Sequence, residues 1–393
     1  NLRRNSIIIP YLLYTFRNFT RCECPFHHPP ILNHPFGAFV LFIQKRDGGV
    51  LMGRIFYSIL WVVAIYMGVF IGHYTPAWLS TPQRTIDFFC WGDTIESELL
   101  EEFEKEYGIQ VKIHPFSSNE EMIVKLKTTQ GKGYDLVCAS DYAIRILKEE
   151  GLIAPLNHAA IPNISHIDTH LLGLNFDPEN SVSLPVEWEP YVIVTREPST
   201  LKIRDLFQDQ KGKKVVMTPD PVEAIMYAAY TLYGKVDHLS DAQLEEVSRL
   251  LKKQKKFIEA YVDHRAKYLI ETDNCDLALI RCGFARLMEQ DHVPIYYNLP
   301  DDWHFVNIEN LAMTSSSKKQ KDVHTFINFF LSHHCQKRHS DHTLVFSVRK
   351  DLGTDSPIVQ KIHEKNDPQF FQYLAKEEDT RDLWVSLKGH DPS

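Results

Sequence analysis

The chain has 393 residues, room for roughly two domains, and its hydrophobic fraction of 44% and charged fraction of 24% are those of an ordinary globular protein. Its net charge is −8 and it has no run rich in Lys or Arg, which argues against nucleic acid as a partner. A mildly acidic surface instead suits a cationic ligand, and the odd number of cysteines, seven, leaves at least one unpaired within the chain.

Residues 1–51 are rich in Pro and His and show no clean hydrophobic period. The first residue is Asn, and we expect this stretch to be a non-native or disordered extension, with Met52 as the true start. Five of its side chains are possible metal ligands, but their spacing fits no standard zinc pattern and we expect no metal there: Cys22, Cys24, His27, His28 and His34.

A long apolar segment follows. Ile55 to Gly72 is uncharged and mainly apolar over 18 residues, just inside the span of about 17–25 that crosses a bilayer. Basic residues precede it, which by the positive-inside rule leaves the rest of the chain outside the cytoplasm: Lys45, Arg46 and Arg54. We interpret residues 52–74 as a signal-anchor, with cleavage near Ala77 or Ser80 as the alternative, and residues 75–84 as a linker.

From Thr85 to Ala143 the pattern alternates strand and helix three times. The predicted strands are Ile86–Cys90, Val111–Ile113 and Asp135–Cys138. Such alternation is typical of a parallel sheet covered by helices, in which ligands bind at the carboxyl ends of the strands. Trp91 and Tyr142 lie just past two strand ends and are therefore expected to face one crevice.

Local signals bound the helices between these strands. Gly108 stands where a helix favours a left-handed residue, Ser118 with Glu121 forms a capping box, and Ser140-Asp141 opens the third helix. Cys90 and Cys138 end two strands that should be neighbours. Buried thiols are the simpler interpretation, and a disulfide stays open because spacing alone does not decide it.

Later segments continue the mixed pattern. Ser181 to Thr195 is either a strand pair or one long bent strand. Asp220, Pro221 and Glu223 occupy the N-cap, N1 and N3 positions of a helix that stops at Gly234. Further strands are expected at 213–217, 276–280, 293–299 and 310–314. Further helices are expected at 201–207, 240–257, 285–289, 323–332, 357–364 and 368–376.

Several short motifs together resemble a known family. They are Trp91 in its spacing, Ser-Asn-Glu-x-Met at 118–122, Lys-Leu-Lys-Thr at 125–128, Tyr-Asp-Leu-Val at 134–137 and Ser-x-Tyr at 140–142. In this order they resemble the periplasmic spermidine/putrescine-binding proteins of bacterial ABC importers. The similarity runs from about Ile86 to about Val348 and is densest before Pro185.

The resemblance implies an α/β, two-lobe periplasmic-binding-protein fold, type II-like, with hinge crossovers and an N-terminal membrane segment before it. Lobe 1 is expected at residues 85–190 and 308–345, lobe 2 at 191–307, and C-terminal helices near the hinge at 346–393. It further implies a protein of the periplasm that delivers a polyamine to a permease and ATPase, and the N-terminal segment is expected to tether it to the inner membrane. No cofactor is expected.

A polyamine needs carboxylates for its ammonium groups and aromatic faces for its cations and methylenes. The resemblance assigns Asp220 and Glu223 to two family carboxylates and Glu309 to a third, at the second hinge crossing. Asp220 and Glu223 also satisfy a capping box, and both roles are compatible because a helix N-terminus favours ionised carboxylates. The remaining expected contacts are Trp91, Ser140 and Tyr142.

The chain departs from the family where aromatic residues are expected. Arg281 and Asn307 replace two family Trp residues, and Thr94 and Leu344 replace two Tyr residues. An Arg in a cation site is unfavourable unless a carboxylate neutralises it. Arg281 therefore turns outward, pairs with Glu309 or Asp220, or grips a carboxylate of the ligand. The last option makes an amino acid or other carboxylated solute the alternative ligand.

An enzyme and a metal-binding transport protein are the rival classes. The sequence has no Gly-x-Ser-x-Gly, Walker or His-Glu-x-x-His motif, so we predict a binding protein rather than an enzyme. His166 and His170 stand four apart in a segment that reads as loop, so chelation by this pair is not expected. A second candidate metal group follows an amphipathic helix: His333, His334, Cys335, His339 and His342.

Overall fold

A computed structural model of the chain describes residues 48–79 and 84–389, apart from 93, 210, 264, 354 and 366. The chain divides into two compact units, Asn1–Thr81 and Pro82–Ser393. The described part of the first unit is one helix, α3 (Gly48–Leu79), which contains the predicted segment 52–74 and continues through residues 75–79 of the expected linker. The predicted extension up to residue 47, with its five possible metal ligands, lies outside the described residues.

The predicted membrane segment does not gain support from this helix. Within the residues that the structure describes, no helix combines the length and apolar character that a bilayer crossing requires.

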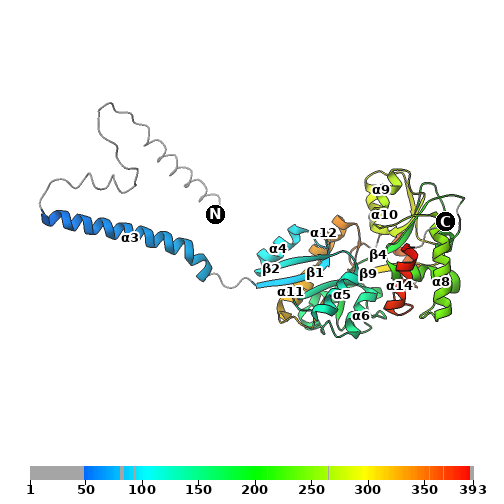
Figure 1. Cartoon of the computed structure of the whole chain (residues 1–393), viewed down its shortest axis with the longest axis horizontal. Coiled ribbons are helices and arrows are strands. Elements are labelled where there is room, and N and C mark those ends of the chain that lie inside the picture. The colour runs from blue at the N-terminus through cyan, green and yellow to red at the C-terminus, as the bar shows by residue number, and fades with distance from the viewer. Residues whose placement is uncertain are drawn as a thin grey trace, which may run out of the picture. The chain divides into compact units, whose positions relative to one another are not determined.

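The second unit is built on one eleven-stranded sheet whose main path runs β2-β1-β3-β9-β4-β7-β5-β6 (Figure 1). Its strands are β1 (Arg84–Trp91), β2 (Ile109–Phe116), β3 (Leu136–Ser140), β4 (Ser183–Thr195), β5 (Val215–Met217), β6 (Ile258–Tyr261), β7 (Leu277–Arg281), β8 (Tyr296–Asn298), β9 (Phe305–Met313), β10 (Phe346–Ser347) and β11 (Gln369–Phe370). Strands β8 and β10 pair with β4, and β11 pairs with β9.

Helices cover the faces of this sheet, which confirms the predicted α/β class. They are α4 (Ser97–Tyr107), α5 (Asn119–Thr129), α6 (Asp141–Glu149), α7 (Pro221–Tyr233), α8 (Asp241–Gln254), α9 (Ala266–Glu271), α10 (Cys282–Gln290), α11 (Gln320–Phe330), α12 (His333–Thr343), α13 (Pro357–Lys365) and α14 (Glu377–Gly389). Short 3-10 turns are η1 (His158–Ala160), η2 (Pro162–His166), η3 (Thr169–Leu171), η4 (Ile203–Phe207) and η5 (Lys255–Phe257).

The first half of the sheet consists of β2, β1, β3 and β9. Strand β1 pairs in parallel with both β2 and β3, as the strand–helix alternation predicts. Fully buried rings on β1, α4 and α11 fix these layers together. Phe326 lies 5.5 Å from Phe88 and 5.0 Å from Phe103, measured between ring centroids. Edge-to-face contacts of this kind add to the apolar area that the rings bury.

Strand β4 continues the sheet into its second half, which consists of β7, β5, β6 and β8. Along residues 183–190 it pairs antiparallel with β9, and along residues 191–195 it pairs antiparallel with β7. The predicted stretch Ser181–Thr195 is thus one long strand rather than a strand pair. Strands β4 and β9 both run through the middle of the sheet, so residues near its centre contact both halves.

One predicted helix is wrong. Residues 368–376 are not a helix, because Gln369 and Phe370 pair with Phe305 and Val306 on β9 instead. The helix that follows, α14, was not predicted, and it packs on α7 and α8.

The simpler interpretation of Cys138 is confirmed, because it is a buried free thiol. The disulfide to Cys90 that spacing left open is therefore not formed.

Candidate ligand-binding site

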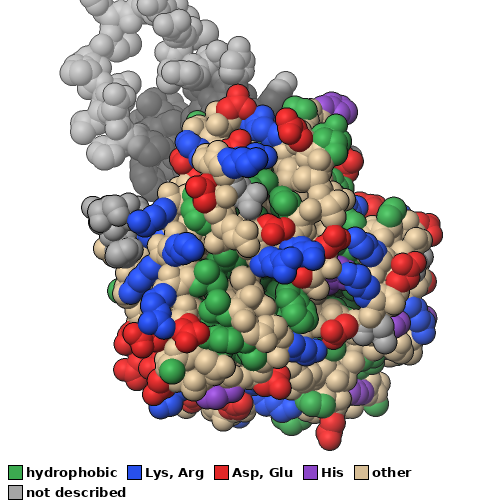
Figure 2. All heavy atoms as spheres, turned by 90° about the vertical axis from the view of Figure 1, so that its right-hand side faces the viewer, with side chains coloured by type: hydrophobic (Ala, Val, Ile, Leu, Met, Phe, Trp, Pro, Cys, Tyr) green, Lys and Arg blue, Asp and Glu red, His purple; other side chains and the backbone are tan. Residues whose placement is uncertain are grey.

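A cavity of about 1020 Å³ opens between the two halves of the sheet. Sites for small molecules usually enclose about 300–1,000 Å³. Among the described residues, eight carboxylates line it, against four basic side chains. The carboxylates are Glu120, Glu187, Glu189, Asp220, Glu223, Asp263, Glu309 and Glu377. The face of the molecule seen in Figure 2 carries acidic and basic side chains interspersed.

Three cross-strand pairs form the cavity floor. Glu187 lies opposite Glu309 and Glu189 opposite Asn307, both between β4 and β9. Tyr191 lies opposite Arg281 on β7. All six side chains line the cavity because alternate residues of a strand point to the same face. An irregularity in the β4–β9 register just before Glu187 determines which residues of β4 face the cavity.

Arg281 is held by two carboxylates. Its Nε donates to Asp263 Oδ2 at 2.8 Å, and its Nη1 lies 3.4 Å from Glu189 Oε1. Glu189 Oε2 also accepts from the amide of Gly283 at 2.8 Å, and a Cβ on Gly283 would meet that oxygen at 2.8 Å. Neither predicted partner, Glu309 or Asp220, forms this pair. The fork of the guanidinium is thus engaged by the protein itself.

Asp220 and Glu223 meet the cavity at the start of α7. Asp220 Oδ1 caps the helix by accepting from the amides of Val222 and Glu223, as predicted. The Glu223 carboxylate does not complete a capping box. It turns to Tyr191, whose hydroxyl donates to Oε1 at 2.5 Å, and to the hydroxyl of Thr218. One carboxylate is therefore fixed by the helix and the other by hydroxyls.

A chain of hydrogen bonds links the carboxylates of the two halves. Ser140 donates to Glu309 Oε1 at 2.7 Å and accepts from Asn119 at 3.0 Å. Asn119 also donates to the hydroxyl of Tyr142 at 2.8 Å, and that hydroxyl donates to Asp220 Oδ2 at 2.5 Å. Ser140 therefore orients Glu309 rather than capping α6. Tyr142 lies behind the cavity wall and acts on the cavity through Asp220.

Aromatic side chains do line the cavity, but mostly at other positions than the family pattern implies. Trp91 lies on the wall as predicted. Asn307 and Thr94 replace family aromatics with small polar groups, and both line the cavity. The remaining aromatic faces come from later segments: Tyr191, Tyr261, Phe284, Tyr373 and Trp384. Tyr261 and Trp384 pack edge to face with their ring centroids 5.1 Å apart.

Burial and crowding disfavour the ionised carboxylates. Burial, with the nearby charge of Glu187, raises the pKa of Glu309 to about 7. Burial raises the pKa of Glu189 to about 7 even though Arg281 opposes the shift. Burial followed by the charge of Asp220 raises the pKa of Glu223, and burial with the charge of Glu120 raises that of Asp220. A bound cation would neutralise these carboxylates and thereby stabilise their ionised forms.

Buried polar atoms on the wall have unused hydrogen-bonding capacity. Among the described residues, Thr94 Oγ1, Asn119 Oδ1 and Glu120 Oε1 are buried and have no hydrogen-bond partner in the protein. All three residues line the cavity. Because such groups are costly to bury unpaired, they indicate that the cavity receives a polar ligand.

The structure brings six of the seven predicted site residues to the cavity wall: Trp91, Ser140, Asp220, Glu223, Arg281 and Glu309. The sequence-based prediction missed three cavity residues, Glu187, Glu189 and Tyr191. Their alternation along one strand was a signal that could have identified them. Tyr373 was assigned to a helix at 368–376 that does not form, and Trp384 lies on α14, which was not predicted.

The predicted metal group on α12 does not converge. His334 pairs with Glu102 at 2.8 Å, whereas buried His339 pairs with Glu187 at 2.5 Å. His333 is exposed and Cys335 is buried in the core. These side chains point to separate partners, so the helix provides no common metal position.

Comparison with known proteins identifies one family. The model of the family described as bacterial extracellular solute-binding protein matches residues 98–371. The spermidine/putrescine-binding periplasmic protein of Escherichia coli strain K12 is 28% identical over 254 residues, which are 63% of this chain and 73% of that protein. The putrescine-binding periplasmic protein PotF of the same strain is 24% identical over 341 residues, 80% of this chain and 89% of that protein.

A solved structure agrees. A putative spermidine/putrescine ABC transporter protein from Listeria monocytogenes superposes with a TM-score of 0.71 at 25% identity, covering 78% of this chain and all of that one. The resemblance predicted from short motifs is thereby confirmed. The matched family and relatives are solute-binding proteins, which supports the prediction of a binding protein rather than an enzyme.

Proposed function

Because this chain belongs to the bacterial extracellular solute-binding proteins, we propose that it captures a polyamine, spermidine or putrescine, in its acidic cavity. The observation that carries the proposal is the excess of buried carboxylates on the wall, interleaved with aromatic faces. Ammonium groups neutralise the carboxylates, and methylenes and cations both pack against aromatic rings.

We further propose that the two halves of the sheet are the two lobes, with approximate bounds 85–190 with 308–345 and 191–307. Strands β4 and β9 then form the hinge, and ligand closes the cleft by a rotation about them. The hydrogen bond from Tyr142 to Asp220 joins the two proposed lobes, and the ion pair from Lys127 to Glu377, 3.2 Å long, joins lobe 1 to the C-terminal segment. The ligand is delivered to a permease and ATPase.

A carboxylated solute such as an amino acid is the second candidate. It requires a cavity cation available to the ligand. Arg281 is engaged by Asp263 and Glu189, and among the described residues the eight carboxylates of the cavity outnumber its four basic side chains, so the polyamine is favoured. A metal-transport role has less support, because the α12 histidines do not converge in the cavity.

A thermal-shift panel tests the ligand class. We expect spermidine and putrescine to raise Tm, since ligand at about 100 times its Kd adds about 2.7 kcal/mol to the free energy of unfolding. Glutamate, glycine and γ-aminobutyrate should give no shift at the same concentration. A shift with a carboxylated compound alone would reverse the choice between the two candidates.

We propose that the protein acts in the periplasm and that the apolar run within residues 52–74 tethers it to the inner membrane. Full-length chain expressed in a Gram-negative host should then stay in the membrane pellet after alkaline carbonate extraction. Replacing three leucine or valine residues of this run by Lys should release it. Complete release of the unaltered chain would show that the segment does not anchor the protein.

A further inference from the structure

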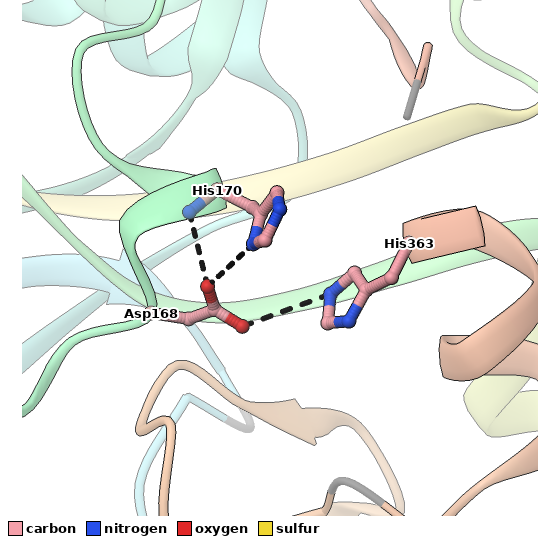
Figure 3. Close-up of side chains that lie close together, drawn as sticks. All are labelled: Asp168, His170 and His363. Carbon is pink, nitrogen blue, oxygen red and sulfur yellow. Dashed lines mark hydrogen bonds and ion pairs between the residues drawn. The ribbon is translucent and has the colours of Figure 1, made fainter. Parts of the chain in front are cut away.

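Three possible metal ligands converge on the side of the second unit, outside the acidic cavity. Asp168 and His170 flank the start of η3, and His363 lies near the end of α13 (Figure 3). In the sequence His170 stands four residues from His166. In the structure its neighbour is instead His363, which comes almost two hundred residues later in the chain. Within the described part of the chain, this is the one group of three or more His, Cys, Asp or Glu side chains close enough to hold a metal ion.

Both imidazole rings direct a nitrogen at the same carboxylate (Figure 3). His170 Nδ1 lies 2.9 Å from Asp168 Oδ1, and His363 Nε2 lies 3.6 Å from Asp168 Oδ2. In a tetrahedral zinc site with bonds of about 2.0–2.1 Å, ligand atoms stand about 3.3 Å apart. The two separations therefore fall on either side of the edge of such a site.

The third edge joins the two histidines, whose ligand atoms lie no more than 4.8 Å apart. The rings of His170 and His363 stack with centroids 4.7 Å apart and planes 17° apart. A modest rotation of His170, whose side chain is 50% exposed, would close this edge. The amide of His170 donates to Asp168 Oδ1 at 3.0 Å, which keeps the carboxylate in place while the ring turns.

The site also has space beside it. The two histidines and Trp188 help to line a small cavity of about 20 Å³. A cavity of about 10–15 Å³ or more holds one water molecule. Three protein ligands with room for one water match the composition of an open zinc site.

We propose that Asp168, His170 and His363 bind a divalent transition-metal ion, Zn²⁺ in the first instance. Two imidazoles and one carboxylate suit Zn²⁺, whereas Mg²⁺ and Ca²⁺ take mainly oxygen ligands. The ion would join η3, which precedes β4, to helix α13. It would thus connect α13 to the segment before β4 without entering the polyamine cavity.

Zinc binding by the purified full chain tests this proposal. Equilibrium dialysis against ZnCl₂ with metal analysis should show one zinc ion fewer per chain in His363→Ala and in Asp168→Asn than in the unaltered protein. The result is the difference in zinc content per chain between the unaltered protein and each variant. Any zinc bound by Cys22, Cys24 or the N-terminal histidines is common to all of them and cancels. His333→Ala, which removes an exposed histidine from α12, is the matched control and should bind as much as the unaltered chain.

Two further readouts guard against a folding artefact. Zinc at about 100 times its Kd should raise the Tm of the unaltered protein by roughly 5 °C, and this rise should be lost or strongly reduced in the site variants. Their Tm without metal should stay within about 2 °C of the unaltered protein. Cobalt bound at the site should give the intense visible absorption of a tetrahedral centre. Equal zinc content in unaltered chain and both site variants overturns the proposal, as does loss in His333→Ala instead.

Discussion

The double variant Asp220→Asn, Glu223→Gln is expected to bind spermidine roughly 10²- to 10³-fold more weakly than the unaltered protein. Each substitution removes one negative charge from the start of α7, where both carboxylates line the cavity. A hydrogen bond to a charged group contributes about 1.5–3 kcal/mol, so two such losses account for the expected change.

The same double variant should fold with undiminished stability. Asn at position 220 still accepts from the amides of Val222 and Glu223, because Asn is as good an N-cap as Asp. Gln at position 223 keeps one oxygen that accepts from a hydroxyl, and its NH2 can donate to the other hydroxyl of the Tyr191 and Thr218 pair, because a hydroxyl both donates and accepts. The double substitution also removes two buried carboxyls whose pKa values are raised, by burial and the charge of Glu120 at Asp220, and by burial and the charge of Asp220 at Glu223. The Tm without ligand is therefore expected to be equal or higher.

A matched control makes the same chemical change elsewhere. Asp241→Asn with Glu245→Gln alters two exposed carboxylates in the first turns of the neighbouring helix α8. Calorimetric titration should give this control the affinity of the unaltered protein. Equal spermidine affinity in the α7 double variant would show that the start of α7 is not part of the binding site.

Removing the Arg281 guanidinium is expected to destabilise the protein by about 2–4 kcal/mol at pH 8. Breaking a buried ion pair leaves its partners uncompensated, here Glu189, which is 5% exposed, and Asp263, which is 22% exposed. At pH 5.5 the loss should be smaller. Burial already raises the pKa of Glu189 to about 7, and without Arg281 the carboxyl takes up a proton still more readily.

Denaturant unfolding of Arg281→Ala at the two pH values measures this difference. Arg249→Ala is the control, since Arg249 is 65% exposed and lies 3.9 Å from its partner Glu246, a pair worth little. Spermidine affinity should stay the same or improve in Arg281→Ala, because a cation leaves the wall. Loss of binding to an amino acid in this variant, with no effect on stability, would instead make Arg281 a ligand clamp.

How much of this site was predictable depends on how local each signal is. Asp220 and Glu309 were found because the family resemblance assigns them to carboxylates of the site, and a local cap also places Asp220 at the start of a helix. Arg281 was correctly assigned to the cavity, but its partners Asp263 and Glu189 lie on other elements, so sequence offered no way to choose them.

In the C-terminal segment, local signals predict the wrong element. Pro368 and the residues after it resemble a helix start, yet Gln369 and Phe370 join the sheet beside Phe305 and Val306. This long-range pairing overrides local propensity. Helix α14 after it was not predicted, and neither was the role of Trp384, one of the aromatic faces that line the cavity where family aromatic residues are missing.

Buried carboxyls also give the ligand-free protein a characteristic pH dependence. Glu309 and Glu189 hold protons in the folded state up to about pH 7, whereas unfolded Glu loses them near pH 4.3. Their contribution to stability is therefore present at low pH and declines as the pH rises through about 7. A bound cation reverses this trend by stabilising the ionised forms.

The most direct measurement is a calorimetric titration with spermidine at pH 6.5 and pH 8, in buffers of different ionisation enthalpy. Amines with pKa values near 10 stay charged in this range. We predict binding of one spermidine per chain with proton release at pH 6.5, and an affinity that rises up to tenfold per pH unit for each proton released. Absence of binding, or binding with neither proton release nor pH dependence, would contradict an acidic cavity that ionises to hold a polyamine.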